Sequence, residues 1–101
     1  MSSQQAVIAD FLKNAYNVDN AAEFYNNLGI NFTKHNYWPA AVSAFGCALD
    51  LNPGSCDYYY NLGLAYLYLG EKTKARYALK QALKINPNHI RAKRLIAEKF
   101  M

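Results

Sequence analysis

The sequence predicts an all-α fold built from antiparallel helix pairs that repeat along the chain. Residues 22–55 and residues 56–89 match each other at an offset of 34 positions, which is the signature of a repeat architecture. Apolar side chains within each unit recur three and four positions apart, as they do on one face of a helix. Proline, glycine and asparagine interrupt this pattern at equivalent places in the two units, where they predict turns.

The matched positions pair residues of similar size over the whole register. The pairs are Tyr25 with Tyr59, Asn27 with Asn61, Leu28 with Leu62, Gly29 with Gly63, Phe32 with Tyr66, Ala41 with Ala75, Phe45 with Leu79, Ala48 with Ala82, Leu51 with Ile85, Asn52 with Asn86 and Pro53 with Pro87. The small members predict positions of close helix approach, and the large members fill the gaps between turns. Glycine inside a helix costs about 1 kcal/mol relative to alanine, so close approach is expected to offset this cost at Gly29 and Gly63.

The first unit is predicted to form two helices. The first carries its apolar stripe at Tyr25, Leu28 and Phe32, and residues 34–36 break the pattern. Pro39 suits the first turn of the second helix. Its apolar stripe consists of Ala41, Ala44, Phe45, Ala48 and Leu49. Residues 52–55 stop this helix, and Ser55 or Asp57 is expected to cap the next one.

The second unit repeats this organisation. It predicts one helix near residues 56–69 and another near residues 72–84, with a stop at Gly70 between them. Asn86-Pro87-Asn88 ends the second helix, because proline cannot continue it. The unit therefore has the same two-helix plan as the first.

Both ends of the chain extend the array. Residues 4–17 align with the second helices at an offset of 33 and predict the second helix of a degenerate earlier repeat. Residues 90–101 lie where a further first helix would begin, and their many polar side chains suit a terminal capping helix. With the repeats at 22–55 and 56–89, they make a single domain, residues 1–101, of about six helices.

These matched positions resemble the tetratricopeptide repeat. The motif residues are Tyr25, Leu28, Gly29, Phe32, Ala41, Phe45, Ala48 and Pro53, and again Tyr59, Leu62, Gly63, Tyr66, Ala75, Leu79, Ala82 and Pro87. The resemblance implies helix pairs stacked in a short right-handed superhelical solenoid. It also implies a concave groove, lined by the first helix of each pair, that holds a peptide or helix of a partner protein. The implied role is a scaffold or adaptor without a cofactor, but the fold alone does not identify the ligand.

If the resemblance holds, helix geometry selects the residues that face the groove. They are Glu23, Asn26, Asn27, Ile30, Lys34, Asp57, Tyr60, Asn61, Leu64, Leu67, Tyr68, Arg91, Arg94 and Glu98. The middle helix is apolar and aromatic there, and exposed apolar strips often mark interaction sites, with Tyr enriched at hot spots. Alternatively, Leu64 and Leu67 belong to the core or are covered by a chain terminus, and Asn27 and Asn61 join adjacent repeats by hydrogen bonds.

One subtype of the family holds the terminal carboxylate of a chaperone tail in a basic clamp. The corresponding positions hold Asn26, Ile30, Asn61, Arg91 and Leu95. Asn61 alone matches this pattern outright, while Arg91 preserves charge. An apolar helix or an extended peptide is therefore the better-fitting ligand.

Charge is distributed unevenly along the chain. Nine of the 11 Lys and Arg residues lie in residues 71–101, which carry a formal net charge of +7, whereas residues 1–70 carry −3. The basic end is a solvated capping face, a site for acidic partners, or a self-association surface that meets the acidic half. Nucleic acid is disfavoured, because Tyr77 and Phe100 are the only aromatic residues interleaved there. Self-association through apolar side chains at the chain ends, Val7, Phe11 and Ile90, is the second functional hypothesis.

The sequence predicts no catalytic, metal-binding or cofactor-binding residues. His35 and His89 fall in turns far apart, and Cys47 and Cys56 match no zinc or redox spacing, so both cysteines are expected to be free thiols. A Cys56–His89 pair is disfavoured, since the two lie about a full repeat apart. Trp38 is expected to be a buried anchor between repeats. No apolar run approaches the roughly 20 residues of a membrane helix, and no secretory signal is predicted, so cytoplasmic localisation is expected.

Overall fold

The described part of the chain is entirely helical. The computed structural model describes residues 4–5, 8 and 18–100. Within residues 18–100 there are five helices: α2 (Val18–Lys34), α3 (Trp38–Leu51), α4 (Cys56–Leu69), α5 (Lys72–Ile85) and α6 (Ile90–Phe100). Gln4, Gln5 and Ile8 also have helical backbone, but the rest of the predicted helix at 4–17, with Val7 and Phe11, lies outside the described residues.

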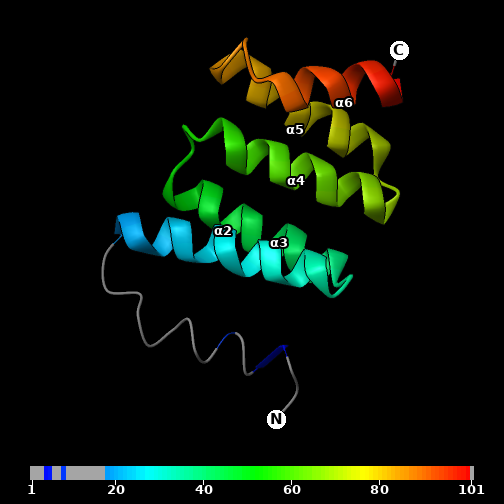
Figure 1. Ribbon diagram of the computed structural model, residues 1–101. Helices are drawn as coiled ribbons and strands as arrows, with labels where there is room; N and C mark the ends of the chain where they lie inside the picture. The colour runs from blue at the N-terminus through cyan, green and yellow to red at the C-terminus, as the bar shows by residue number, and fades with distance from the viewer. Residues whose placement is uncertain (1–3, 6–7, 9–17, 101) are drawn as a thin grey trace.

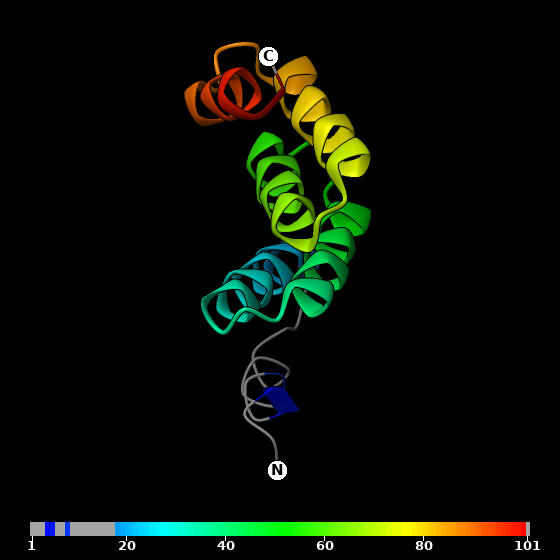
Figure 2. The same cartoon turned by 90° about the vertical axis from the view of Figure 1, so that its right-hand side faces the viewer.

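The helices form two stacked layers. Figure 1 shows α2, α4 and α6 one above another, and Figure 2 shows them as one layer with α3 and α5 as the other. Antiparallel neighbours along the chain, α2 with α3 and α4 with α5, pack as pairs, and α3 packs on α4 to join the pairs. This confirms the predicted all-α fold of helix-pair repeats. The layer of first helices, called here the inner layer, presents the predicted groove residues.

Close helix approach explains the two matched glycines. A Cβ atom added at Gly29 would lie 2.5 Å from Cε1 of Phe45, and one added at Gly63 would lie 2.8 Å from Cγ of Leu79. Phe45 and Leu79 are the largest fully buried side chains among the described residues. Each glycine therefore admits the large side chain of its paired helix, as the sequence predicted.

The core has two parts. The first lies between α2, α3 and α4 and contains Phe24, Leu28, Phe32, Ala41, Ala44, Phe45 and Ala65, with Ile8 packed against it. The second lies between α5 and α6 and contains Leu79, Ala82 and Ala92, against which Tyr59, Tyr60, Leu95 and Ile96 pack. Side chains of α4, α5 and α6 therefore all contribute to this second, smaller core.

Each repeat ends in the same turn. Asn52 donates its backbone N–H to the carbonyl of Ala48, and its Oδ1 accepts from the N–H of Gly54 at 3.3 Å. Asn86 repeats this arrangement with Ala82 and with the N–H of Asn88, at 3.0 Å. Side-chain amides of this kind mimic a backbone turn. Both chain reversals are thus built locally, from residues two apart.

The cap after each turn is also matched. The Oγ atom of Ser55 accepts from the N–H of Tyr58 at 3.2 Å, so Ser55 rather than Asp57 caps α4. His89 is the equivalent residue one repeat later, and its Nδ1 atom accepts from the N–H of Ala92 at 3.1 Å. A cap of this type satisfies an N–H group that has no partner inside the helix.

The turns within the pairs differ from each other. Pro39 occupies the first turn of α3. Gly70 ends α4 with φ +87°, in the left-handed region, and the N–H of Glu71 bonds to the carbonyl of Tyr66. Asn36 has φ +60°, a conformation that asparagine tolerates better than most residues. Gly70 therefore works as the helix stop that the sequence predicted.

Candidate interaction site

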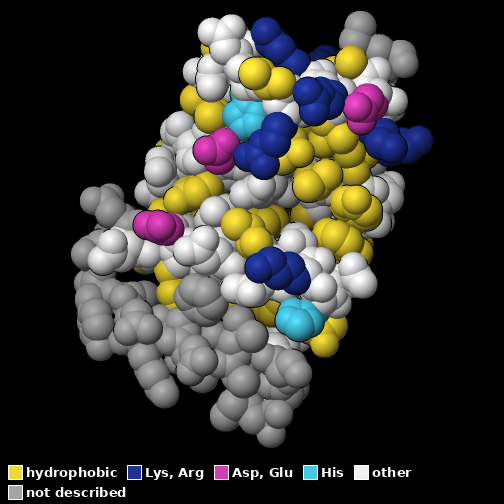
Figure 3. All heavy atoms as spheres, viewed as in Figure 1, with side chains coloured by type: hydrophobic (Ala, Val, Ile, Leu, Met, Phe, Trp, Pro, Cys, Tyr) yellow, Lys and Arg dark blue, Asp and Glu magenta, His cyan; other side chains and the backbone are white. Residues whose placement is uncertain are grey.

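The candidate site is the exposed face of the inner layer. The predicted groove residues lie on three helices: Glu23, Asn26, Asn27, Ile30 and Lys34 on α2, Asp57, Tyr60, Asn61, Leu64, Leu67 and Tyr68 on α4, and Arg91, Arg94 and Glu98 on α6. Figure 3 shows hydrophobic side chains gathered over α4 and between α4 and α6, with Lys and Arg side chains along the margin. The apolar part of this face therefore lies toward the second repeat.

The seam between α2 and α4 is joined by an amide pair. The Nδ2 atom of Asn61 donates to Oδ1 of Asn26 at 2.9 Å. Asn27 is exposed, and its backbone carbonyl accepts from Nδ2 of Asn31 at 3.1 Å. Within the described residues Asn61 thus bonds between adjacent repeats, in agreement with the structural alternative for this residue. The hydrogen bond of Asn27 lies within α2 and not between repeats. Ile30 packs against the first core.

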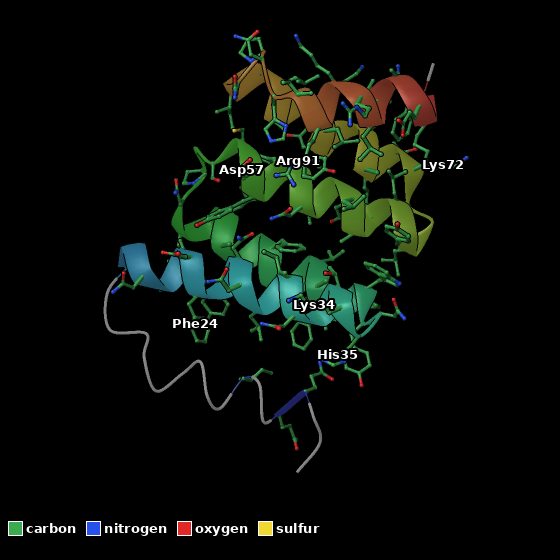
Figure 4. All side chains as sticks on the ribbon, viewed as in Figure 1. Phe24, Lys34, His35, Asp57, Lys72 and Arg91 are labelled. Carbon is green, nitrogen blue, oxygen red and sulfur yellow. The ribbon has the colours of Figure 1, made fainter. Side chains whose placement is uncertain are left out.

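The start of the α4–α6 seam is held by four side chains. The Nε2 atom of His89 lies 2.8 Å from Oδ1 of Asp57, and its ring stacks on that of Tyr60 at 5.3 Å between centroids. The guanidinium carbon of Arg91 lies 4.7 Å from the Tyr60 ring centroid, and its Nη2 lies 3.9 Å from Oδ1 of Asp57. Figure 4 shows Asp57 at the start of α4 and Arg91 between α4 and α6, beside it. Tyr60 is therefore already engaged by Arg91 and His89.

His89 has a defined tautomer. Its Nδ1 atom accepts a hydrogen bond from the Ala92 N–H, so the proton of the neutral ring is on Nε2, which donates it to Asp57. His89 is only 7% exposed, whereas Asp57 is 64% exposed. The side chain consequently links the cap of α6 to the start of α4.

Cys56, Asp57 and His89 place their potential ligand atoms within 4.8 Å of one another. The expectation that Cys56 and His89 lie far apart is therefore wrong, because stacking brings equivalent positions of consecutive repeats together. A metal at Nε2 of His89 would need a lone pair on that atom, which requires the proton to move to Nδ1. That proton would face the Ala92 N–H and break the cap. The observed arrangement suits a structural link better than a metal site.

An apolar hollow lies between α4 and α6 at the other end of the seam. It has a volume of about 320 Å³ and is lined by Leu64, Leu67, Tyr68, Lys72, Leu95 and Lys99. A smaller hollow of about 200 Å³, lined by Tyr60, Arg91, Arg94, Leu95 and Glu98, shares Leu95 with it. Leu64 and Leu67 are half-buried. The two hollows together bring most of the predicted α4 and α6 residues onto one surface.

Tyr68 also marks the boundary between the repeats. Its ring stacks on the indole of Trp38, with centroids 4.4 Å apart and planes 7° from parallel. Trp38 is half-buried and packs against the first core, as expected for an anchor between repeats, while Tyr68 is 63% exposed. One face of the Tyr68 ring is thus held by Trp38.

Glu23 lies in the first half of α2 and Lys34 is its last residue, and neither is among the residues that line the hollow. Glu23 acts electrostatically on a neighbour: burial, and then the negative charges of Glu23 and Asp57, raise the pKa of Tyr58 above its ordinary value of 10.0. The direction follows because burial and nearby negative charge both disfavour the phenolate. This end of the inner layer is consequently acidic.

Three lining residues of the hollow were missed from the sequence. Leu95 was considered only as a clamp position, and Lys72 and Lys99 were assigned to the general basic surface. Lys72 begins α5 and Lys99 lies in the last turn of α6, so only the packing of the helices brings them to the same hollow.

Cys47 and Cys56 are free thiols. No helix within the described residues is long and apolar enough to cross a bilayer.

Comparisons with known proteins agree with this architecture. The family profile "Tetratricopeptide repeat" matches residues 56–89. The tetratricopeptide repeat and J domain-containing co-chaperone DNJ1 of Cryptococcus neoformans var. grubii is 32% identical over 75 residues. That match covers 74% of this chain but only 14% of the co-chaperone.

Two solved structures have the same fold. MamA aligns with a TM-score of 0.70 and 39% identity, over 71% of this chain and 42% of that one. YrrB, described as a tetratricopeptide-repeat protein with an unusual peptide-binding site, aligns with a TM-score of 0.72 and 30% identity, over 81% of this chain and 41% of that one. The chain therefore spans less than half the length of each of these relatives.

Proposed function

Since the chain is a tetratricopeptide-repeat protein, we propose that its inner layer docks a peptide or helix of a partner protein. The docking surface is centred on α4 and α6, with Leu64, Leu67, Tyr68 and Leu95 as the apolar contacts. A rigid groove of this kind lowers the conformational cost of ordering a flexible ligand. The function is binding rather than catalysis.

The hollow beside Leu64 and Leu67 carries this proposal. An apolar concavity of about 320 Å³ on a helical face falls at the lower end of the roughly 300–1,000 Å³ of known ligand sites. Leucine side chains that line an open hollow leave apolar surface in water, and a ligand that covers it is favoured. The described peptide-binding site of YrrB gives a precedent for a peptide ligand on this fold.

The test is a selection from a random peptide library on the immobilised chain, followed by affinity measurements. Replacing Leu64 with serine removes an apolar contact, so we expect the selected peptides to bind about tenfold more weakly, which corresponds to about 1.4 kcal/mol. Tyr77→Ser is the matched control, because Tyr77 is an exposed apolar residue of α5, in the layer opposite the groove. The affinity of this variant for the selected peptides should be unchanged.

Two results would remove the proposal. The first is a selection that enriches no peptide. The second is a set of peptides that bind Leu64→Ser as tightly as the original chain and lose affinity to Tyr77→Ser. Circular dichroism of both variants checks that the helices are retained.

A further inference from the structure

We infer that the hollow between α4 and α6 selects an acidic amphipathic segment, whose apolar side chains cover the leucines and whose carboxylates lie against Lys72 and Lys99. This inference rests on the proposed function and names the class of ligand. It also gives the segment a direction: its acidic residues lie at the Lys72 end of α4, not at the Asp57 end.

The floor of the hollow is apolar and its rim is cationic. Leu64, Leu67 and Leu95 form the floor, and Lys72 and Lys99 line the same hollow. Both lysines are exposed, and neither forms an ion pair with another residue among those described. A cation beside apolar surface attracts a carboxylate more strongly than one fully surrounded by water. An apolar segment with acidic side chains at one end satisfies both features.

The other positive charge of this seam is already used. Arg91 lies over the Tyr60 ring and within 3.9 Å of Asp57, so part of its charge is offset within the chain. Arg94 and Glu98 both line the adjoining hollow, so a cation and an anion lie on that surface together. Within the part of the chain that the structure describes, Lys72 and Lys99 are the two cations that line the larger hollow, and no acidic side chain lines it with them.

The acidic end of the inner layer gives the segment its polarity. Asp57 lies in the first turn of α4, while Lys72 follows the end of that helix (Figure 4). Carboxylates near Asp57 and Glu23 would meet like charge, which costs affinity. The distance from Asp57 to Tyr68 along α4 is about 16 Å at 1.5 Å per residue. A segment of about five extended residues or three helical turns would span it with its acidic end at Lys72 and Lys99.

The experiment compares four blocked synthetic peptides by fluorescence anisotropy with the intact chain. All carry the same leucine stripe and have acetylated and amidated ends, so that no terminal carboxylate contributes. The first two peptides differ only at their amino ends, where one carries glutamates and the other carries glutamines. The second two differ in the same way at their carboxyl ends. We expect one glutamate peptide to bind at least tenfold more tightly than its glutamine twin, and the reversed one to gain less.

The variants locate the effect. Lys72→Gln/Lys99→Gln should abolish the preference for glutamate while leaving the glutamine peptides unchanged. Lys80→Gln/Lys84→Gln is the control with the same loss of charge, on exposed positions of α5. The preference should persist in this control and weaken as salt is raised, because exposed charges are screened.

Different failures have different meanings. Equal binding of glutamate and glutamine peptides, both lost in Leu64→Ser, overturns the acidic ligand class but leaves the proposed function standing. If Lys80→Gln/Lys84→Gln reduces the preference for glutamate as much as Lys72→Gln/Lys99→Gln does, the preference depends on net charge alone, which overturns the inference. Failure of all four peptides, together with an empty library selection, overturns the proposed function itself. Dimers that sedimentation detects over a hundredfold concentration range, and that Leu64→Ser dissociates, would make a second copy the occupant and also overturn the inference.

Discussion

The two repeats use the same backbone devices and different side chains on their inner faces. Gly29 and Gly63 each admit a large buried residue of the paired helix, and Asn52 and Asn86 build the same turn. In contrast, the inner face changes from Asn26 in the first repeat to Tyr60 in the second. The comparison separates what the fold requires from what a ligand can use.

The cap position shows this difference most clearly. Ser55 bonds only locally, to the N–H of Tyr58, whereas His89 caps α6 and also contacts Asp57 and Tyr60 on α4. His89 therefore joins α6 to the preceding repeat in addition to capping it. Exchanging side chains between equivalent positions is therefore the way to test which differences matter.

The largest effect is expected at the shared glycines. Gly29→Ala would press a methyl group against the buried Phe45 ring, and overpacking of about 3 kcal/mol would exceed the gain of about 1 kcal/mol in helix propensity. We expect a net destabilisation of about 2 kcal/mol in urea unfolding. Gly63→Ala should also destabilise the fold, because its Cβ would lie 2.8 Å from Cγ of Leu79 and 3.2 Å from the backbone carbonyl oxygen of Ala75.

Gly46 is the control for this comparison. A Cβ added there meets nothing within 4 Å, so Gly46→Ala should stabilise the chain by up to about 1 kcal/mol. If Gly29→Ala and Gly46→Ala changed the free energy of unfolding equally, close helix approach would not explain why glycine occurs at the same position in both repeats.

The cap residues come next. His89→Ala removes the cap, the contact with Asp57 and the stacking on Tyr60, so we expect a loss of about 1–2 kcal/mol. His89→Ser copies the residue at position 55 and should recover only the share due to the cap. Hydrogen exchange of the α6 amides measures the local effect. Full recovery by serine would show that the contacts with α4 contribute nothing to stability.

The amide pair between α2 and α4 should contribute less. A double-mutant cycle of Asn26→Ala and Asn61→Ala is expected to give a coupling energy of about 1 kcal/mol. The same cycle with Asn27 in place of Asn26 should give a coupling close to zero, because Asn27 is exposed and bonds within α2. Comparable coupling in both cycles would contradict the observed pairing.

The smallest effect concerns pH. Tyr58 has a raised pKa in the folded state, so the folded chain holds this proton more tightly than the unfolded chain does. Its contribution to stability is complete below pH 10.0, the ordinary value, and is lost as pH rises through the folded-state value. Tyr58→Phe copies Phe24, the equivalent residue, and should reduce the fall in stability above pH 10.0, measured by unfolding at several pH values.

Features that depend on neighbours along the chain could be predicted from the sequence. The predicted helix at residues 56–69 has the observed bounds of α4, because Ser55 and Gly70 act within one turn of the helix ends. The Gly29 and Gly63 contacts followed from a repeated spacing. Each of these signals is read within one repeat, where helix periodicity and turn residues suffice.

Contacts between repeats could not be read in the same way. His89 meets Asp57 across 32 positions of sequence, and the sequence suggested that His89 and Cys56 were distant. Asn61 and Asn27 were both considered for bonds between repeats, but Asn61 forms one, with Asn26, whereas the bond of Asn27 lies within α2. Lys72 and Lys99 reach one hollow only through the packing of α4, α5 and α6. These assignments depend on the angle and shift between stacked pairs, which residue spacing does not specify.

Because Asn52 and Asn86 form the same turn, the segment between them can be duplicated within the chain. A duplicated copy of residues 56–89, inserted after His89, would start behind the same asparagine turn and would present a second Asp57 to follow the first His89. The added unit would pack on the pair α4 and α5 on one side and receive α6 on the other. Longer chains could thus be produced by gene duplication without a new loop, and each copy would add another α4 face to the inner layer.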